Sequence, residues 1–252
     1  MTAVPYLCKL PKHHPRVIVA IDGPAGSGKS TTARRVAERT GWLYLDTGAM
    51  YRAAGLAFLR EGVPFTPEAA ARLMPGTTVD LTEADGDATG LRVLLDGDDV
   101  TDAIRTPEAS RAASRAATLG PVRDKLVEAQ RRIARREAAA GRGVVLEGRD
   151  IGTVVFPDAD VKFFLTADLG ARARRRHAEL AERAAAVGTE APALDAVEGD
   201  LDERDRRDAG RALAPLRPAA DAVVLDTTAL TVEEQVERVL DAIRARGGPV
   251  PA

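Results

Sequence analysis

The stretch "GPAGSGKS", Gly23 to Ser30, constrains the fold of this chain more than any other segment. It fits the pattern G-x-x-x-x-G-K-[ST], and it follows the apolar β-branched run "RVIVAID" and precedes a segment that predicts a helix. Glycines let the backbone wrap closely around phosphates, so that main-chain N–H groups and the positive helix N-terminus face the anion. The sequence therefore predicts an ATP site in this loop, with Lys29 reaching the β- and γ-phosphates and the Ser30 hydroxyl ligating Mg²⁺. The expected ATP contacts are Gly23, Pro24, Ala25, Gly26, Ser27, Gly28, Lys29, Ser30 and Thr31.

The remaining pattern predicts a single α/β domain. Five short apolar runs predict buried strands at 16–23, 42–46, 143–148, 160–166 and 221–226. Helices are expected at 29–40, 47–61, 107–118, 121–140 and 231–246. This alternation is typical of a five-stranded, mostly parallel sheet flanked by helices.

Three segments stand apart from that alternation. Residues 1–15 hold three prolines and no periodicity, which predicts a disordered leader before one domain at 16–252. Alternation at 77–97 predicts a β-hairpin within a small insert at about 74–105. An arginine-rich helical segment at about 168–200 is the expected lid, and the low complexity of 184–199 predicts mobility there.

Composition narrows the class of protein and its compartment. The 252 residues are 45% hydrophobic, enough for one sizeable core, and no apolar run approaches the roughly 18 residues of a membrane span. The single cysteine, Cys8, cannot form an internal disulfide, which favours the cytoplasm. A net charge of −2 argues against a general nucleic-acid binder, and we expect a monomer.

The absence of asparagine excludes two classes of nucleotide-binding protein, and the basic residues are unusual as well. The chain has no asparagine, so it lacks the base-reading signature of guanine-nucleotide switches and the catalytic-loop asparagine of protein kinases. Of its 36 basic residues only 5 are lysine, so 31 are arginine. A GC-rich coding bias explains most of this excess, but it does not explain why the arginines cluster where they do. The planar fork of arginine pairs with phosphate oxygens two at a time.

Three separated motifs together resemble the bacterial cytidylate kinases, a family of P-loop nucleoside monophosphate kinases. They are the stretch 21–52 ending in "DTGAMYR", the stretch 147–167 beginning "EGRDIGT", and "RDRRDAGRALAPL" at 204–216. Order and spacing match from about Arg16 to the last helix. Thr47 and Glu147 depart modestly from the serine and aspartate that are common at these positions.

The resemblance implies a P-loop kinase fold and the transfer of the ATP γ-phosphate to CMP or dCMP. It implies that the β-rich insert binds the acceptor and that the helical lid closes over ATP through Arg175 and Arg176. Catalytic roles fall to Lys29, Arg149, Arg204 and Arg211. The implied acceptor contacts are Thr47, Tyr51, Arg52, Ser114, Arg123, Arg149, Asp150, Arg204, Asp208 and Arg211.

Chemistry supports a cytosine reader among these residues. A carboxylate such as Asp150 accepts a hydrogen bond from the cytosine amino group, whereas uracil presents a carbonyl oxygen there. The residues leave two alternatives open, a kinase of another small acceptor (UMP, AMP or a shikimate-like alcohol) and an ATP-driven switch protein. An alcohol acceptor would call for a positioned base, and a switch would hydrolyse ATP without any acceptor.

Overall fold

A computed structural model describes residues 17–84 and 87–248 of the chain. The expected leader at 1–15, which includes Cys8, lies outside the described residues, as does the tip of the predicted hairpin at 85–86. The central sheet has five strands, all parallel, in the order β2-β6-β1-β7-β8. These strands are β1 (Ile18–Asp22), β2 (Leu43–Asp46), β6 (Val144–Gly148), β7 (Val161–Thr166) and β8 (Val223–Asp226). The predicted α/β class and parallel sheet are confirmed.

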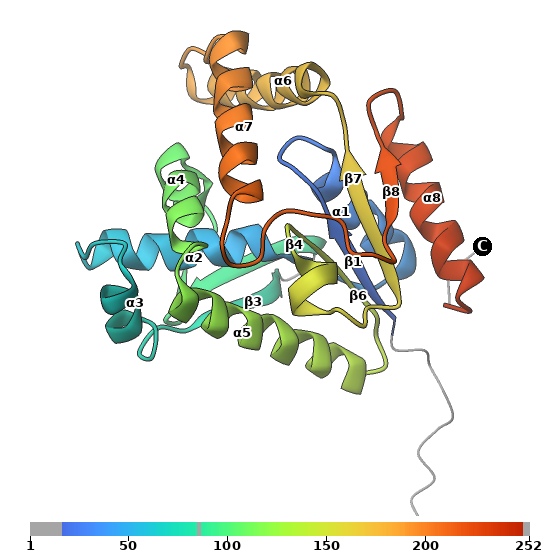
Figure 1. The fold of residues 1–252 in the computed structure, drawn as a ribbon, viewed down its shortest axis with the longest axis horizontal. Coiled ribbons are helices and arrows are strands. Elements are labelled where there is room, and N and C mark those ends of the chain that lie inside the picture. The colour runs from blue at the N-terminus through green and yellow to red at the C-terminus, as the bar shows by residue number, and fades with distance from the viewer. Residues whose placement is uncertain (1–16, 85–86, 249–252) are drawn as a thin grey trace, which may run out of the picture.

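Helices cover both faces of the sheet (Figure 1). Helices α1 (Lys29–Thr40) and α8 (Val232–Ala245) bury one apolar cluster against it, which includes Val36, Val239 and Phe163. Helices α2 (Thr47–Arg60) and α5 (Gly120–Ala139) bury a second cluster on the other face, and α4 (Pro107–Ala116) packs along α2. Strands β1 and β6 are buried, as their apolar runs predict. The prediction of a buried strand at 221–226 was wrong in part, because β8 lies at the edge of the sheet, where Val223 and Val224 are exposed and only Leu225 is buried.

The predicted insert contains a second, antiparallel sheet. Strand β3 (Val79–Ala84) pairs with β4 (Asp87–Leu95), and a short β5 (Asp98–Asp99) extends it before the 3₁₀ turn Ala103–Arg105. One helix at its entrance was not predicted, α3 (Pro67–Leu73), although Thr66 caps it by accepting from Ala69 N and Pro67 opens it.

The segment predicted to be a lid folds into two helices, α6 (Leu169–Val187) and α7 (Leu194–Ala209), which lie together at the top of Figure 1. They pack with Ala25 of the phosphate loop through a small apolar cluster that includes Ala173, Val197 and Leu201. The stretch 184–199 therefore supplies the end of α6 and the start of α7, and helical structure continues past the predicted lid boundary at 200. Among the described residues, no helix is both long and apolar enough to cross a bilayer.

Candidate active site

The phosphate loop joins β1 to α1, as its sequence predicts. Gly23 has a φ of 153°, and a Cβ at this position would lie 2.1 Å from the Leu165 carbonyl oxygen, so a side chain cannot be accommodated. Ser27 Oγ and Lys29 Nζ both donate to the Pro24 carbonyl oxygen, at 3.0 and 3.1 Å. The loop is thus shaped by its own hydrogen bonds. Its segment Gly23–Thr31 holds all nine residues that were predicted to contact ATP.

Ser30 is held by a buried carboxylate. Its Oγ donates to Glu147 Oε2 at 2.6 Å, and the Tyr44 hydroxyl donates to Oε1 of the same carboxylate at 2.5 Å. Glu147 is only 3% exposed. Burial, followed by the charge of Glu147, raises the pKa of Tyr44 well above its usual value, so the tyrosine remains a hydrogen-bond donor. Three segments distant in sequence therefore fix the orientation of the Ser30 hydroxyl.

Arg52 is positioned by the start of its own helix. Asp46 caps α2 by accepting from Ala49 N at 2.9 Å, and its other oxygen accepts from Arg52 Nη2 at 2.8 Å. Burial opposes the charge, but the Asp46 carboxylate raises the pKa of Arg52 above its usual value. Thr47 Oγ1 donates to the Glu147 carbonyl oxygen at 2.7 Å. These bonds place Arg52 and Thr47 beside the carboxyl end of β6.

Three arginines surround Asp208. Arg149 Nε donates to Asp208 Oδ2 at 2.9 Å, Arg211 donates to Oδ1, and Arg204 Nε lies 3.9 Å from Oδ2. Burial disfavours ionisation of Asp208, yet the charges of Arg149, Arg211 and Arg204 hold its pKa below the usual value. The Nε atoms of Arg204 and Arg211 are buried without a hydrogen-bond partner among the described residues. The single negative charge of Asp208 therefore does not balance the three arginines, and the two Nε donors remain available for a ligand.

This cluster extends to the phosphate loop. Burial and repulsion from Arg149 lower the pKa of Lys29 to about 7, and Arg204 contributes in the same direction. Partial burial, followed by repulsion from Arg149 and then Arg52, lowers the pKa of Arg204 to about 10. Arg52, Arg149 and Arg204 are thus near enough for their charges to interact within one cluster that includes Lys29. Such an excess of positive charge is suited to polyanions.

Two of the three predicted base-reading residues, Arg123 and Asp150, are in contact, whereas Ser114 is buried on α4 and has no hydrogen bond to either of them among the described residues. Arg123 Nη2 donates to Asp150 Oδ2, and both side chains are only 7% exposed. Burial raises the pKa of Tyr51 to about 12, and the charges of Arg123 and Asp150 act on its hydroxyl. Ser114 is 5% exposed on α4. Arg123 and Asp150 thus form a buried pair that borders the Asp208 cluster, since the charges of Tyr51 and Arg123 also act on Arg211.

The two predicted lid arginines differ in their contacts. Arg175 donates to the Thr227 hydroxyl at 3.1 Å and to the Thr227 carbonyl oxygen at 2.5 Å, so it is bound to the loop after β8. Arg176 forms an exposed pair with Glu179 at 2.8 Å, and its charge acts on Arg204. The charge of Arg176 thus reaches the cluster, while Arg175 is held by hydrogen bonds at Thr227.

Sequence reasoning missed several polar residues that organise the site. They are the carboxylates of Asp22, Asp46 and Glu147 at the ends of strands, the hydroxyl of Tyr44, and the guanidinium of Arg172. Arg172 Nη1 donates to the Ala25 carbonyl oxygen at 3.1 Å, which joins α6 to the phosphate loop. The signal for the carboxylates was available, because carboxyl ends of parallel strands share one edge of a sheet.

The oxygens around Ser30 fit a magnesium ion. Mg²⁺ prefers hard oxygen ligands and retains waters, so it needs few protein atoms. The Ser30 hydroxyl and the Glu147 carboxylate provide such oxygens at the phosphate loop, 2.6 Å apart. Within 17–84 and 87–248 there is no cluster of three or more His, Cys, Asp or Glu side chains arranged to hold a metal.

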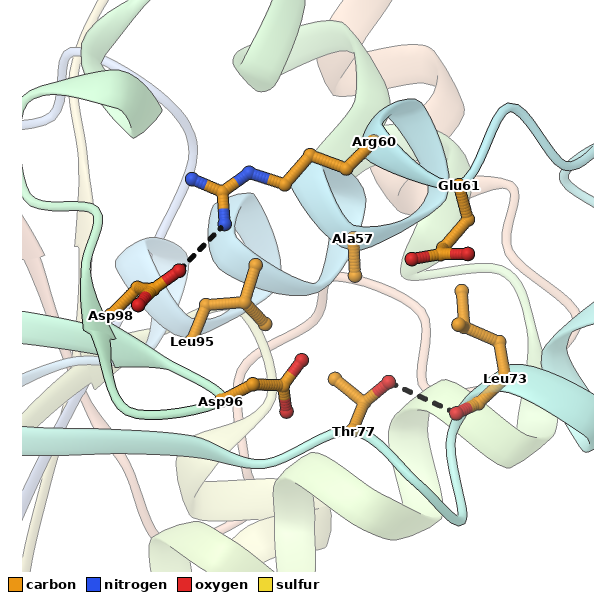
Figure 2. A pocket seen from close by; sticks show the side chains of 8 residues that line it. All are labelled: Ala57, Arg60, Glu61, Leu73, Thr77, Leu95, Asp96 and Asp98. Carbon is orange, nitrogen blue, oxygen red and sulfur yellow. Dashed lines mark hydrogen bonds and ion pairs between the residues drawn. The ribbon is translucent and has the colours of Figure 1, made fainter.

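The described residues also line two cavities, of which only the second reaches a predicted site residue. One of about 120 Å³ is bordered by the C-terminal end of α2 and by β4, where Arg60 Nη1 lies 3.7 Å from Asp98 Oδ2 (Figure 2). None of the predicted site residues lines it. The other, of about 400 Å³, runs along α5 and includes Arg123 in its lining, together with Arg131 and Val154. Arg131 there donates to the Val154 carbonyl oxygen at 3.0 Å, which caps the short π-helix Ile151–Val155.

Comparison with known proteins gives a consistent result. The family model for cytidylate kinase matches residues 19–245. A cytidylate kinase of Salinibacter ruber is 51% identical, over 92% of this chain and 99% of the relative. The cytidylate kinase of Pelodictyon phaeoclathratiforme is 48% identical, over 92% of this chain and 96% of the relative. That of Desulfitobacterium hafniense is 50% identical, over 88% of this chain and 90% of the relative. The chain therefore belongs to the cytidylate kinase family.

Proposed function

We propose that this protein transfers the γ-phosphate of ATP to CMP or dCMP, giving ADP and CDP or dCDP. The observation that carries the proposal is the convergence of guanidinium groups from three distant segments beside the phosphate loop, where their charges act on one another and on Lys29. Family membership names the acceptor, and the excess of positive charge explains how two polyanions are held end to end.

ATP is assigned to the loop Gly23–Thr31, with Lys29 on its β- and γ-phosphates. The pKa of about 7 belongs to the free protein, and the negative phosphates favour the protonated lysine. Ser30 would hold Mg²⁺, with Glu147 orienting its hydroxyl. When bound, Mg²⁺ neutralises charge on the ATP phosphates. Arg176 and Arg175 are assigned to the lid over ATP, Arg175 after release from Thr227.

The chain's contribution to the reaction is positioning and charge stabilisation. The nucleophile is an oxygen of the CMP phosphate, which is anionic near neutral pH and needs no general base. It forms a bond to the γ-phosphorus as the bond from that phosphorus to the ADP oxygen breaks. Arg52 and Arg149 hold the acceptor phosphate, while Arg204 and Arg211 stabilise the transferring group.

Acceptor recognition is assigned to the buried pair and its neighbours. Asp150 accepts from the cytosine amino group, Arg123 donates to the ring acceptors, and Ser114 adds a hydroxyl. Thr47 and Tyr51 line the same pocket for the acceptor. Asp208 also receives a contact to the ribose in this scheme. Both of its oxygens already accept from arginines, but each carboxylate oxygen has a second lone pair, so a ribose hydroxyl can donate to Asp208 without displacing an arginine.

An acceptor panel tests the proposal. ADP release is measured with ATP, Mg²⁺ and either CMP, dCMP, UMP, AMP, shikimate or no acceptor. We expect high kcat/KM for CMP and dCMP, low values for UMP and AMP, and almost no hydrolysis without an acceptor. UMP turnover as efficient as CMP turnover would reject the base-reading assignment. Rapid ATP hydrolysis without acceptor would favour the switch protein instead. We further propose that the protein is cytoplasmic and monomeric. Size-exclusion chromatography with light scattering checks the monomer, and fractionation of cells checks the compartment.

A further inference from the structure

Asp22 is a buried carboxylate that holds two main-chain amides from a distant loop. It is the last residue of β1, directly before Gly23 of the phosphate loop, and it is 4% exposed. Its Oδ1 accepts from Ile151 N and its Oδ2 accepts from Gly152 N, both at 2.8 Å. Both carboxylate oxygens are therefore used, each on a separate amide.

The two amides belong to the loop that carries two of the residues assigned to CMP binding. Ile151 directly follows Arg149 and Asp150, the residues that we assign to the phosphate and the base of CMP. The backbone here leaves β6 and turns into the π-helix Ile151–Val155, whose start has no side-chain cap from Asp150. The Asp150 side chain is instead paired with Arg123. The turn is thus held from outside, by Asp22 on the neighbouring strand.

We propose that Asp22 is a positioning residue that fixes the loop of Arg149 and Asp150 relative to the ATP loop. This inference rests on the proposed function. The main chain of Asp22 is joined by one peptide bond to Gly23 of the phosphate loop, and its carboxylate is joined by two hydrogen bonds to the loop of Arg149 and Asp150. It sets the distance between the two loops and, with it, the alignment of the acceptor phosphate with ATP.

The electrostatics of Asp22 agree with a functional reason for its presence. Burial, together with the nearby Asp150 charge, raises its pKa to about 6, although the two amide hydrogen bonds and the charge of Arg149 act in the opposite direction. Near neutral pH the protein therefore keeps a poorly solvated carboxylate in its core. A group that is costly to bury and that spans two parts of an active site is typical of function.

The variant Asp22→Asn tests the proposal with little change in volume. An amide has one acceptor oxygen, so one of the two loop amides faces an N–H₂ group and loses its bond. Asp160→Asn is the matched control, because Asp160 Oδ2 accepts from Ile18 N at 2.8 Å at the other end of β1, where it is exposed. Steady-state kinetics are measured for CMP, UMP and ATP with both variants.

We expect Asp22→Asn to raise the KM for CMP about tenfold and to narrow the CMP-to-UMP ratio of kcat/KM by a similar factor. The KM for ATP should stay within about twofold, and Asp160→Asn should behave as the unmodified protein. An unchanged KM and ratio would overturn the proposal. Equal increases in the KM values for ATP and CMP would also overturn it, since Asp22 would then support only the fold.

A measurement on the unmodified protein answers the question if Asp22→Asn does not fold. Hydrogen exchange of the Ile151 and Gly152 amides is followed without nucleotides. Slow exchange supports the two hydrogen bonds to Asp22 on which the proposal depends, and exchange as fast as in exposed loops contradicts them. The acceptor panel with the unmodified protein separates the two proposals. If CMP is a poor acceptor for the unmodified protein, the proposed function is wrong. If CMP is a good acceptor and Asp22→Asn has the same kinetics as the unmodified protein, only the positioning role is wrong.

Discussion

Replacing Asp150 by alanine should weaken the discrimination between CMP and UMP. Asp150 and Arg123 are both 7% exposed, so the substitution leaves a buried guanidinium without its carboxylate. Breaking a buried pair in this way costs about 3–5 kcal/mol of folding stability. For catalysis, the variant loses the acceptor of the cytosine amino group. We expect kcat/KM for CMP to fall by about 10²–10³-fold, or roughly 3–4 kcal/mol at about 1.4 kcal/mol per factor of ten.

The loss for UMP should be only about tenfold, because the carboxylate opposes the uracil carbonyl and its removal relieves that repulsion. The coupled assay compares both acceptors for the unmodified protein, Asp150→Ala, Arg123→Ala and the double variant. Thermal unfolding of the same four proteins forms a double-mutant cycle. Because the double variant has no unpaired buried charge, it should be more stable than the sum of the single losses predicts. Equal kinetic losses for CMP and UMP would refute the reasoning.

Three other substitutions or measurements follow from the site. Arg52→Ala should raise the KM for CMP at least tenfold and spare ATP binding, and unchanged acceptor kinetics would remove Arg52 from the site. Lys29, with its pKa of about 7, is largely neutral at pH 8, so the binding of ATP should make it take up a proton. Calorimetry of ATP binding in buffers of different ionisation enthalpy should show more proton uptake at pH 8 than at pH 6. A binding enthalpy that does not depend on the buffer would contradict this. Tyr44→Phe leaves one Glu147 oxygen without its donor and should cost about 1–2 kcal/mol of stability while raising the Mg²⁺ needed for half-maximal activity, whereas an unchanged Mg²⁺ requirement would argue against the orientation of Ser30 by this pair.

Much of the fold was predictable because local patterns decide it. The glycine loop fixed the β1–α1 connection, and continuous apolar runs marked all five parallel strands. Helix α3 could also have been predicted, since Thr66 and Pro67 are ordinary start signals that the preceding Pro64 obscured. Helix ends were within a few residues wherever proline or glycine punctuated them.

The site was only partly predictable, because strand order determines which carboxylates meet. The sequence does not reveal that β6 lies between β1 and β2, yet this order places Asp22 beside Gly148 and Asp46 beside Glu147. The hydrogen bond between Ser30 and Glu147 depends on that order. The contact of Arg175 with Thr227 likewise depends on how α6 packs, which no local pattern encodes.

The most direct test of the account is a crystal structure with CMP, Mg²⁺ and a non-hydrolysable ATP analogue bound together. We expect the CMP phosphate to lie in line with the γ-phosphate, contacted by Arg52 and Arg149, with Arg204 between the two nucleotides and Lys29 on the ATP side. A CMP phosphate bound away from these arginines, or one pointing away from the γ-phosphate, would contradict the claim that they bring two polyanions together.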